Sequence, residues 1–313
     1  MEPKCPLCNL SSLLARRGTY KIWTLVECPD CALQFFWPLR HPGVSYYHST
    51  YVACRDASSQ AYPLAWYHRQ FLEALPHDRP VGRTLLDVGC GPGMLLAKAR
   101  DVGYQALGLD VNLAALQQAE TIYGLRPDQL FRGTLEEWMG AHPEKKVEVI
   151  TAFEVLEHLE DPARFLREVH TVLCPGGILA LSVPNRERFF LRRERSDFPP
   201  HHLTRWSSVT LCGALQRSGF DILRVAQQPP TQGWAIQHLL DSFAFLNIWR
   251  VARANTATAV RQIPGAIEGI RGVNTFLRGI TIGVLWLPAL LLSGVAGMIR
   301  RPGFSLYVVA RQR

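Results

Sequence analysis

The sequence predicts an α/β fold, a Rossmann-like parallel sheet covered by helices, with a small cysteine-rich module in front of it. From about Val81, short apolar runs alternate with helical patterns, which is typical of a doubly wound sheet. Before that point the chain carries two C-x-x-C pairs. Of the 313 residues, 48% are hydrophobic and 19% charged, so a sizeable core can form and extensive disorder is excluded.

The N-terminal cysteines have the spacing of a metal site. The candidate ligands are Cys5, Cys8, Cys28 and Cys31. Two C-x-x-C turns on a short hairpin can aim four thiolates at one ion, a tetrahedral arrangement that suits zinc. We therefore expect a zinc ribbon over residues 1–45, and a structural role, because a closed four-cysteine site leaves no position for a substrate. Asn9 and Ala32 stand where such a ribbon turns with positive φ, which alanine tolerates less well than asparagine.

A glycine-rich turn follows the first expected strand of the sheet, residues 84–88, and leads into a helix over 94–100. Such a turn lets a ligand approach the backbone closely, and the start of the helix supplies free N–H groups. The second strand, 106–110, ends in Asp110, whose carboxylate can accept hydrogen bonds from both hydroxyls of a ribose. A third strand is expected near 130–133. The turn reads D-x-G-x-G-x-G, not the G-x-G-x-x-G of dinucleotide enzymes.

Four segments in chain order resemble the motifs of class I S-adenosylmethionine (SAM) dependent methyltransferases: 85–93, 108–112, 152–158 and 173–177. They are most similar to the ubiquinone-biosynthesis O-methyltransferase type. The C-P-x-C knuckles, residues 35–40, and Tyr46, Tyr47 and Tyr51 resemble zinc-ribbon methyltransferases of bacterial glycan and secondary-metabolite pathways. Together the motifs cover about residues 5 to 228. The resemblance implies a seven-stranded sheet and an enzyme that transfers a methyl group from SAM.

The resemblance also implies which residues hold SAM. The glycine turn would approach the methionine part through Asp87, Gly89, Gly91 and Gly93. Asp110 would hold the ribose, and Leu135 would face the adenine with its backbone and apolar surface. Phe153 would border the methionine part, or simply pack beneath its strand end. Many relatives carry an acidic residue where Thr134 stands, so the usual contact with the adenine amino group is in doubt.

The chemistry is expected at the carboxyl end of the fourth strand, 147–153. Methyl transfer displaces an activated sulfonium, so the protein mainly aligns the acceptor and removes a proton where needed. His158, with Glu157 beside it, is a candidate general base. Glu154, Glu157 and His158 together are a candidate divalent-cation site, a role linked to the matching positions of the ubiquinone-type relatives. The third interpretation is that this turn only caps the following helix.

A second pair of candidates, His201 and His202, lies in a loop that overhangs the acceptor pocket in the resembling families. Each is a candidate base or substrate contact; alternatively, the loop only starts the next helix at Ser207. The fifth strand, 178–183, ends in Ser182-Val-Pro-Asn185. It lacks the N-P-P-Y or D-P-P-Y signature for methylation of exocyclic amines of bases, which argues against DNA as the substrate.

Two further segments flank or interrupt this core, expected over 81–228. Residues 46–80 would form an aromatic helical lid, by the same resemblance. Strands at 221–226 and 304–311 should be antiparallel neighbours, with 304–313 closing the sheet, yet residues 229–303 separate them. We expect a hydrophobic helical insertion there.

Within the insertion, residues 279–299 carry no charge and are flanked by arginines. At ~1.5 Å per residue such a helix could reach across a ~30 Å hydrocarbon core. A single crossing would place the last strand on the opposite side of the membrane from the rest of the sheet. We therefore expect a re-entrant or interfacial element, or a second crossing. Residues 229–303 contain seven arginines and two acidic residues, a balance that suits anionic lipid headgroups. The alternatives are a buried helical dimer interface and a helix that covers the sheet edge.

These observations predict O-methylation, rather than C-methylation, of a membrane-associated small molecule or lipid-linked acceptor such as a glycan, a quinone-like head group or a lipid. The cofactors would be SAM and a structural Zn²⁺. No apolar stretch follows a basic segment at the N-terminus, so we expect a cytoplasmic, peripheral or monotopic protein. The net charge of +8 fits an anionic partner without requiring one.

The alternatives are an RNA methyltransferase that uses the ribbon, which the charge pattern disfavours, and an inactive SAM-binding scaffold. The oligomeric state is not predicted.

Overall fold

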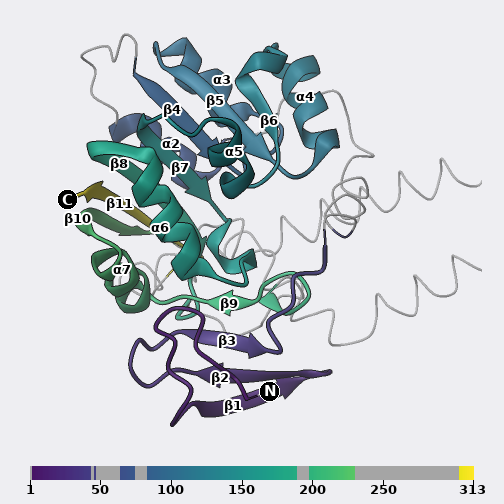
Figure 1. The fold of residues 1–313 in the computed structure, drawn as a ribbon, viewed down its shortest axis with the longest axis vertical. Helices are drawn as coiled ribbons and strands as arrows, with labels where there is room; N and C mark the ends of the chain where they lie inside the picture. The colour runs from purple at the N-terminus through teal and green to yellow at the C-terminus, as the bar shows by residue number, and fades with distance from the viewer. Residues whose placement is uncertain (1, 44–45, 47–63, 75–82, 189–196, 230–302) are drawn as a thin grey trace, which may run out of the picture. The chain divides into compact units, whose positions relative to one another are not determined.

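The computed structural model describes residues 2–43, 46, 64–74, 83–188, 197–229 and 303–313 (Figure 1). The chain divides into two compact units, Met1–Gln228 with Phe304–Arg313, and Pro229–Gly303. The expected membrane insertion, including the uncharged residues 279–299, lies outside the described residues, as does most of the expected lid. Within the described ranges, every helix is too short or too polar to cross a membrane.

Seven strands form the main sheet, in the order β10-β11-β8-β7-β4-β5-β6 (Figure 1). The strands are β4 (Thr84–Val88), β5 (Gln105–Asp110), β6 (Leu130–Arg132), β7 (Val147–Phe153), β8 (Leu173–Pro184), β10 (Phe220–Gln227) and β11 (Ser305–Gln312). The first five run parallel, and β11 pairs antiparallel with both β8 and β10. This confirms the predicted seven-stranded sheet. Because β4 pairs with both β5 and β7, the order reverses there, and ligands of such sheets bind at that point.

Helices cover both faces of this sheet. They are α2 (Trp66–Ala74), α3 (Met94–Asp101), α4 (Leu113–Tyr123), α5 (Leu135–Ala141), α6 (Pro162–Val172) and α7 (Ser208–Arg217), with 3₁₀ turns η1 (Pro127–Gln129) and η2 (Leu156–His158). Neighbouring strand residues point to opposite faces, so Leu86 and Ile150 enter one core while Leu85 and Val149 enter the other. Helices α5, α6 and α7 contribute to the first core, and α2, α3 and α4 to the second.

The cysteine module builds a second sheet, in the order β1-β2-β3-β9. Its strands are β1 (Ala15–Tyr20), β2 (Trp23–Glu27), β3 (Gln34–Trp37) and β9 (Thr204–Arg205). Strand β9 comes from the loop that carries His201 and His202, and the sequence did not predict it. It pairs antiparallel with β3, so the edge of the ribbon is joined to that loop.

The ribbon shares its hydrophobic core with the main sheet. Buried Leu33 and Phe35 of the ribbon belong to the same apolar cluster as Trp206 and Leu211, which lie beside and within α7. Tyr20 also stacks on Phe198 of the loop, with ring centroids 4.2 Å apart. The ribbon and the sheet therefore form one folding unit, although their sequence motifs are separate.

This shared core predicts a large effect from Phe35→Ala. Phe35 is fully buried, and deletion of such a ring costs about 3–5 kcal/mol in free energy of unfolding. We expect that loss in a single cooperative denaturant transition followed by circular dichroism.

The control is Ile22→Ala in the same ribbon, where the side chain is 76% exposed, and the expected change is within about 0.5 kcal/mol. Two separate transitions, with only the first shifted by Phe35→Ala, would contradict a shared core.

Candidate active site

The three glycines of the turn after β4 have left-handed φ values of 73°, 53° and 80° at Gly89, Gly91 and Gly93. They serve different purposes. A Cβ on Gly89 would lie 2.7 Å from Val155 Cγ2, and one on Gly93 would lie 2.6 Å from Leu125 Cδ1. A Cβ on Gly91 would meet no atom within 4 Å. The outer glycines therefore permit close packing, while Gly91 presents bare backbone on an open side, as a bound ligand requires.

Two carboxylates flank this turn, buried Asp87 and half-buried Asp110. Asp110 Oδ2 accepts a hydrogen bond from Gly91 N (2.9 Å) and Oδ1 accepts one from Asn112 N (2.8 Å). Asp87 Oδ1 accepts from Thr151 Oγ1 at 2.6 Å. Burial raises the pKa of both carboxyl groups, that of Asp87 to about 7. A cationic ligand such as a sulfonium with an α-ammonium group would offset the cost of their negative charge.

The expected adenine-facing segment is the start of α5. Thr134 is its N-cap: Thr134 Oγ1 accepts from Glu137 N (3.2 Å) and Glu137 Oε2 accepts from Thr134 N (2.7 Å), a reciprocal capping box. Thr134 thus takes part in helix capping. The Leu135 side chain is 3% exposed and packs in the first core. Only its backbone remains for the role that the sequence suggested.

Phe153, at the end of β7, packs among aromatic side chains of α2. Its ring stacks on Tyr67 at 5.1 Å between centroids and meets His68 edge-on at 5.3 Å. Tyr307 of β11 lies on the same cluster. The sequence suggested an aromatic lid over 46–80 without singling out Tyr67 or His68, because the contact depends on the packing of α2 against the sheet.

The candidate bases gather from two distant segments. His158 in η2 and His201 and His202 in the loop have ring centroids 4.7–4.9 Å apart. Glu157 Oε1 lies 3.8 Å from His158 Nε2 and 3.9 Å from His202 Nε2. We call these four residues the histidine–glutamate cluster. Burial lowers the pKa of His158 to about 4 and that of His202 to about 2, and burial raises the pKa of Glu157.

Glu154 does not join this cluster as the sequence suggested. Its backbone has a φ of 56°, and its Oε1 accepts a hydrogen bond from Ser182 Oγ at 2.8 Å. Burial raises its pKa to about 7, offset in part by hydrogen bonds from Ser182 and Ser305. Among the described residues, the side chains of Glu154, Glu157 and His158 therefore do not form a group of close ligand atoms. Such a group is formed instead by His158, His201 and His202.

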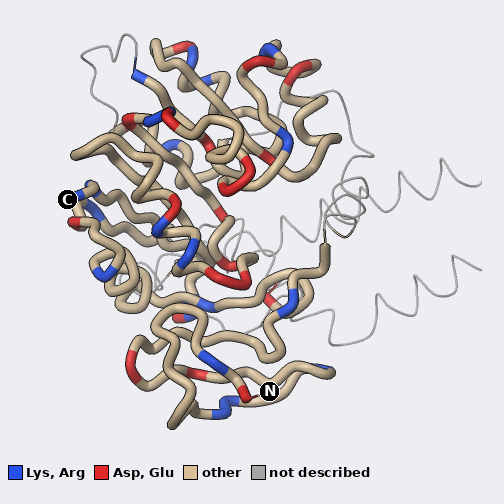
Figure 2. Tube along the Cα trace, in the orientation of Figure 1, with Lys and Arg blue, Asp and Glu red and all other residues tan. Residues whose placement is uncertain are grey.

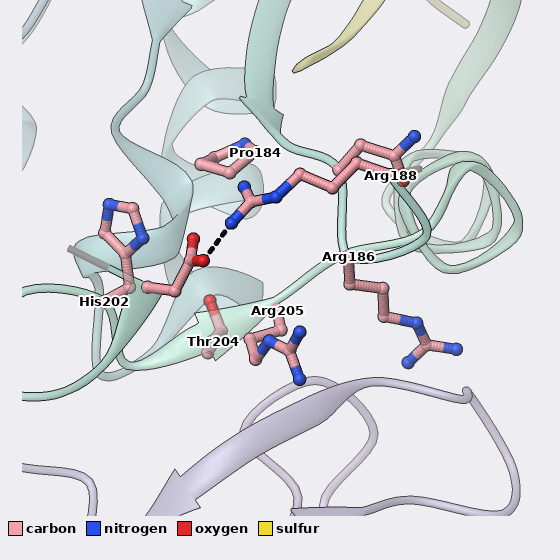
Figure 3. Close-up of a pocket in the computed structure, with 8 residues that line it drawn as sticks. Pro184, Arg186, Arg188, His202, Thr204 and Arg205 are labelled. Atoms are coloured by element: carbon pink, nitrogen blue, oxygen red, sulfur yellow. Dashed lines mark hydrogen bonds and ion pairs between the residues drawn. The ribbon is translucent and has the colours of Figure 1, made fainter. Parts of the chain in front are cut away.

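A hollow between the end of β8 and the ribbon is lined by His202 and three arginines (Figure 3). Arg188 forms an ion pair with Asp197, drawn as the dashed line. Arg186 donates to the Ala32 carbonyl, and Arg205 donates to Gln34 Oε1 at 3.0 Å. Arg186 and Arg205 thus join the ribbon to the segment that follows β8, whereas Arg188 pairs within that segment.

The four N-terminal cysteines fit a zinc ion. Their sulfur atoms lie within 4.8 Å of one another, with Cys5 to Cys31 and Cys8 to Cys28 each at 3.5 Å. Tetrahedral zinc with Zn–S bonds of ~2.3 Å separates its sulfurs by about 3.8 Å. The two knuckles repeat the same backbone bonds, from Asn9 N to Cys5 O (3.0 Å) and from Ala32 N to Cys28 O (2.9 Å). Asn9 and Ala32 have φ values of 63° and 56°, the expected positive-φ positions.

Loss of one sulfur ligand should affect the metal site of the ribbon and leave SAM binding largely unchanged. We expect Cys28→Ser to lose the bound zinc and to lower the thermal midpoint by about 5 °C or more, because metal binding contributes to folding. SAM affinity should stay within about threefold, because the glycine turn lies outside the ribbon.

Elemental analysis, thermal unfolding and calorimetric SAM titration check this. Cys212→Ser, a half-buried thiol outside the ribbon, is the matched control and should leave the zinc in place. Full zinc content in Cys28→Ser would refute the four-sulfur site.

The raised pKa of Asp87 predicts a pH-dependent stability. Its carboxyl group loses its proton at about pH 7 in the folded chain and near pH 4 when unfolded, so its contribution to stability falls between these values. We compare the free energy of unfolding of SAM-free Asp87→Asn with that of wild type. We expect this difference to favour the variant by at least about 1 kcal/mol more at pH 8 than at pH 4.5.

Urea unfolding at both pH values measures this difference. Asp128→Asn, at an exposed carboxylate of η1, should show the pH dependence of wild type. An identical pH dependence in Asp87→Asn would show that Asp87 ionises as an ordinary carboxylate.

Comparisons with known proteins agree with this geometry. Residues 60–225, more than half of the chain, match the family model described as "Methyltransferase domain". A "Probable S-adenosylmethionine-dependent methyltransferase" of Mycolicibacterium smegmatis is 33% identical over 159 residues, 50% of this chain and 60% of the relative. A ubiquinone biosynthesis O-methyltransferase of Albidiferax ferrireducens is 33% identical over 134 residues, 42% of this chain and 53% of the relative. The chain thus spans a little over half the length of these relatives.

One solved structure shows the same fold over most of the chain. The [4+2]-cyclase SpnF aligns with a TM-score of 0.51 and 19% identity, covering 87% of this chain and 97% of that chain. At this identity the likeness speaks for the fold alone. The family match, the strand order and the glycine turn lead to one conclusion: the chain belongs to the family of methyltransferase domains.

Proposed function

We propose that the chain transfers a methyl group from SAM to an oxygen atom of a membrane-associated, lipid-linked or quinone-like acceptor. The observation that carries the proposal is the histidine–glutamate cluster, which follows β7 directly. Strand β7 is the neighbour of β4, whose end forms the glycine turn. Proton-handling groups at the carboxyl edge of a SAM-type sheet are what methylation of a hydroxyl requires.

The donor half of the site is assigned to the turn after β4. Gly91 offers bare backbone, two backbone N–H groups fix the Asp110 carboxylate that would hold the ribose, and buried Asp87 suits the positive charges of SAM. SAM supplies an activated methyl group. The protein's contribution is to hold the sulfonium in line with the acceptor oxygen and to exclude water.

The acceptor half is assigned to the histidine–glutamate cluster. His158 Nδ1 lies 2.7 Å from the His201 carbonyl oxygen, to which it can only donate. In the neutral ring this leaves Nε2 with a lone pair on the side of Glu157. A hydroxyl placed at the cluster would be activated as its oxygen attacks the methyl carbon.

The membrane-borne nature of the acceptor is inferred from the sequence of the insertion. Residues 279–299 are uncharged and flanked by arginines, a composition that suits the boundary of an anionic membrane. We accordingly propose a cytoplasmic protein that docks on a membrane. RNA is a less suitable acceptor, because in the described part of the chain Lys and Arg are interspersed with Asp and Glu instead of forming a continuous basic stripe (Figure 2).

Transfer of a labelled methyl group from SAM into a cell extract tests this proposal. The extract is separated into organic-soluble lipid, water-soluble glycan and RNA. We expect label in the lipid fraction, and a loss of at least tenfold with Asp110→Ala, because that change removes the ribose acceptor and the anchor of Gly91 N.

Asp128→Ala, at an exposed carboxylate of η1 beyond α4, is the matched control and should retain the label. Label in RNA would replace the proposed acceptor class with a nucleic acid. The absence of label from every fraction would favour a SAM-binding scaffold without transferase activity.

A further inference from the structure

Three arginines line the hollow between the end of β8 and the ribbon (Figure 3). Among its described lining residues, Arg186, Arg188 and Arg205 are positively charged and Asp197 is negatively charged. His202 adds no charge near neutral pH, because burial lowers its pKa to about 2. Three positive charges less one negative charge leave an excess of two, which a bound anion would balance.

The surroundings of Arg186 leave its charge in place. It donates to the Ala32 carbonyl, a neutral oxygen. Glu27 interacts with it electrostatically, but that carboxylate is bound by Arg17 at 2.9 Å. Because the pair of Glu27 and Arg17 is neutral as a whole, it does not cancel the excess in the hollow.

The ion pair of Arg188 with Asp197 shows that the hollow accommodates an oxyanion. The two side chains are only 13% and 9% exposed, so the guanidinium binds a carboxylate largely out of water. The guanidinium lies over the Phe304 ring, 5.4 Å from its centroid. A guanidinium has five N–H donors and binds carboxylate and phosphate oxygens alike. Asp197 therefore occupies a position that the oxygen atoms of a ligand could take.

The free space limits what can enter the hollow. It has a volume of about 10 Å³, room for roughly one water molecule. A whole acceptor does not fit there, and a small charged group fits when Arg188 exchanges its carboxylate partner for it. A phosphate group carries about −1.5 to −2 charges near pH 7 and several acceptor oxygens, which matches the excess of positive charge.

The hollow adjoins the acceptor half of the site. His202 belongs both to its lining and to the histidine–glutamate cluster. Pro184 and Asn185, at the end of β8, also line it, and β8 is the parallel neighbour of β7, which leads into the cluster. A ligand with its charged group in the hollow would therefore have its neighbouring atoms beside the histidines.

We infer that this hollow binds a phosphate group of the methyl acceptor, with Arg188 as its principal ligand. The inference rests on the proposed function and narrows its acceptor class to phosphorylated molecules. Arg186 contributes charge, because its side chain is directed away from the Arg188–Asp197 pair in Figure 3. The bound phosphate group would hold the acceptor hydroxyl at the histidines, a positioning effect without a covalent step.

Binding of inorganic phosphate to the full chain tests the inference without SAM or acceptor. Phosphorus NMR line widths at constant ionic strength measure the affinity. We expect Asp197→Asn to bind phosphate about threefold or more tightly than wild type, because Arg188 is released from its carboxylate. The double variant Arg188→Gln/Asp197→Asn should bind it at least about tenfold more weakly than Asp197→Asn, because charge-assisted hydrogen bonds are lost.

Both variants avoid a buried carboxylate without its partner, so they form a matched pair. Arg126→Gln, at an exposed ion pair beside η1, is the control and should bind phosphate as wild type does. Acetate should bind wild type at least about tenfold more weakly than phosphate, because it carries less charge. Calorimetric SAM titration identifies the variants that are folded. Weaker phosphate binding by folded Asp197→Asn, or equal binding of acetate and phosphate, would overturn the inference.

The methyl-transfer assay connects the hollow with the acceptor. We expect an anion exchanger to retain the labelled lipid. Label in uncharged lipid would overturn the assignment to the acceptor and leave a site for free phosphate. Phosphate binding without label in any fraction would refute the proposed function and leave the hollow as an anion site, so the two failures are distinguishable.

Discussion

The pairing of β3 with β9 is the interaction on which the acceptor side of this protein depends. Phe36 N donates to the Leu203 carbonyl oxygen at 2.9 Å, and on the other side Leu203 N donates to the Glu157 carbonyl oxygen. One residue of the loop is therefore held by the ribbon and by η2 at once. A surface loop loses considerable conformational entropy when it becomes ordered. The strand pairing offsets that cost and places the two loop histidines beside Glu157.

The two halves of the site are positioned by different means. The donor half is local: Asp87, the glycine turn and Asp110 follow from two adjacent parallel strands, so consecutive segments of chain meet at one sheet edge. The acceptor half is not local, because His158 and His202 come from segments far apart in the sequence, which two hydrogen bonds, packing and the ribbon edge hold together. We therefore expect the first half to tolerate changes in distant parts of the chain better than the second, because fewer long-range contacts maintain it.

The same distinction decides what the sequence could predict. The individual strands of the main sheet, the glycine turn and the two cysteine pairs were predictable because each has a contiguous pattern, and the seven-stranded sheet followed from the family resemblance. Strand β9 was not, because Thr204-Arg205 has no strand signal and becomes a strand only when β3 lies beside it. Glu154 was grouped with Glu157 and His158 because all three follow the fourth strand and match positions of the ubiquinone-type relatives. Its positive φ and the hydrogen bond from Ser182 turn it away, and both depend on the neighbouring strand.

The ribbon is more than a stabilising appendage, although its four-sulfur site is closed to substrates. The Ala32 carbonyl, at the turn of the second knuckle, accepts hydrogen bonds from Arg186 and from Thr210 Oγ1. These two residues lie on either side of the histidine loop, one after β8 and the other in α7. A change in the geometry of that knuckle would shift both ends of the loop as well as its pairing with β3. Because the contacts are shared, binding of a metal ion in the ribbon would favour the observed positions of the acceptor-side histidines. A metal ion bound by the four cysteines would therefore act on the acceptor side only through these shared backbone contacts.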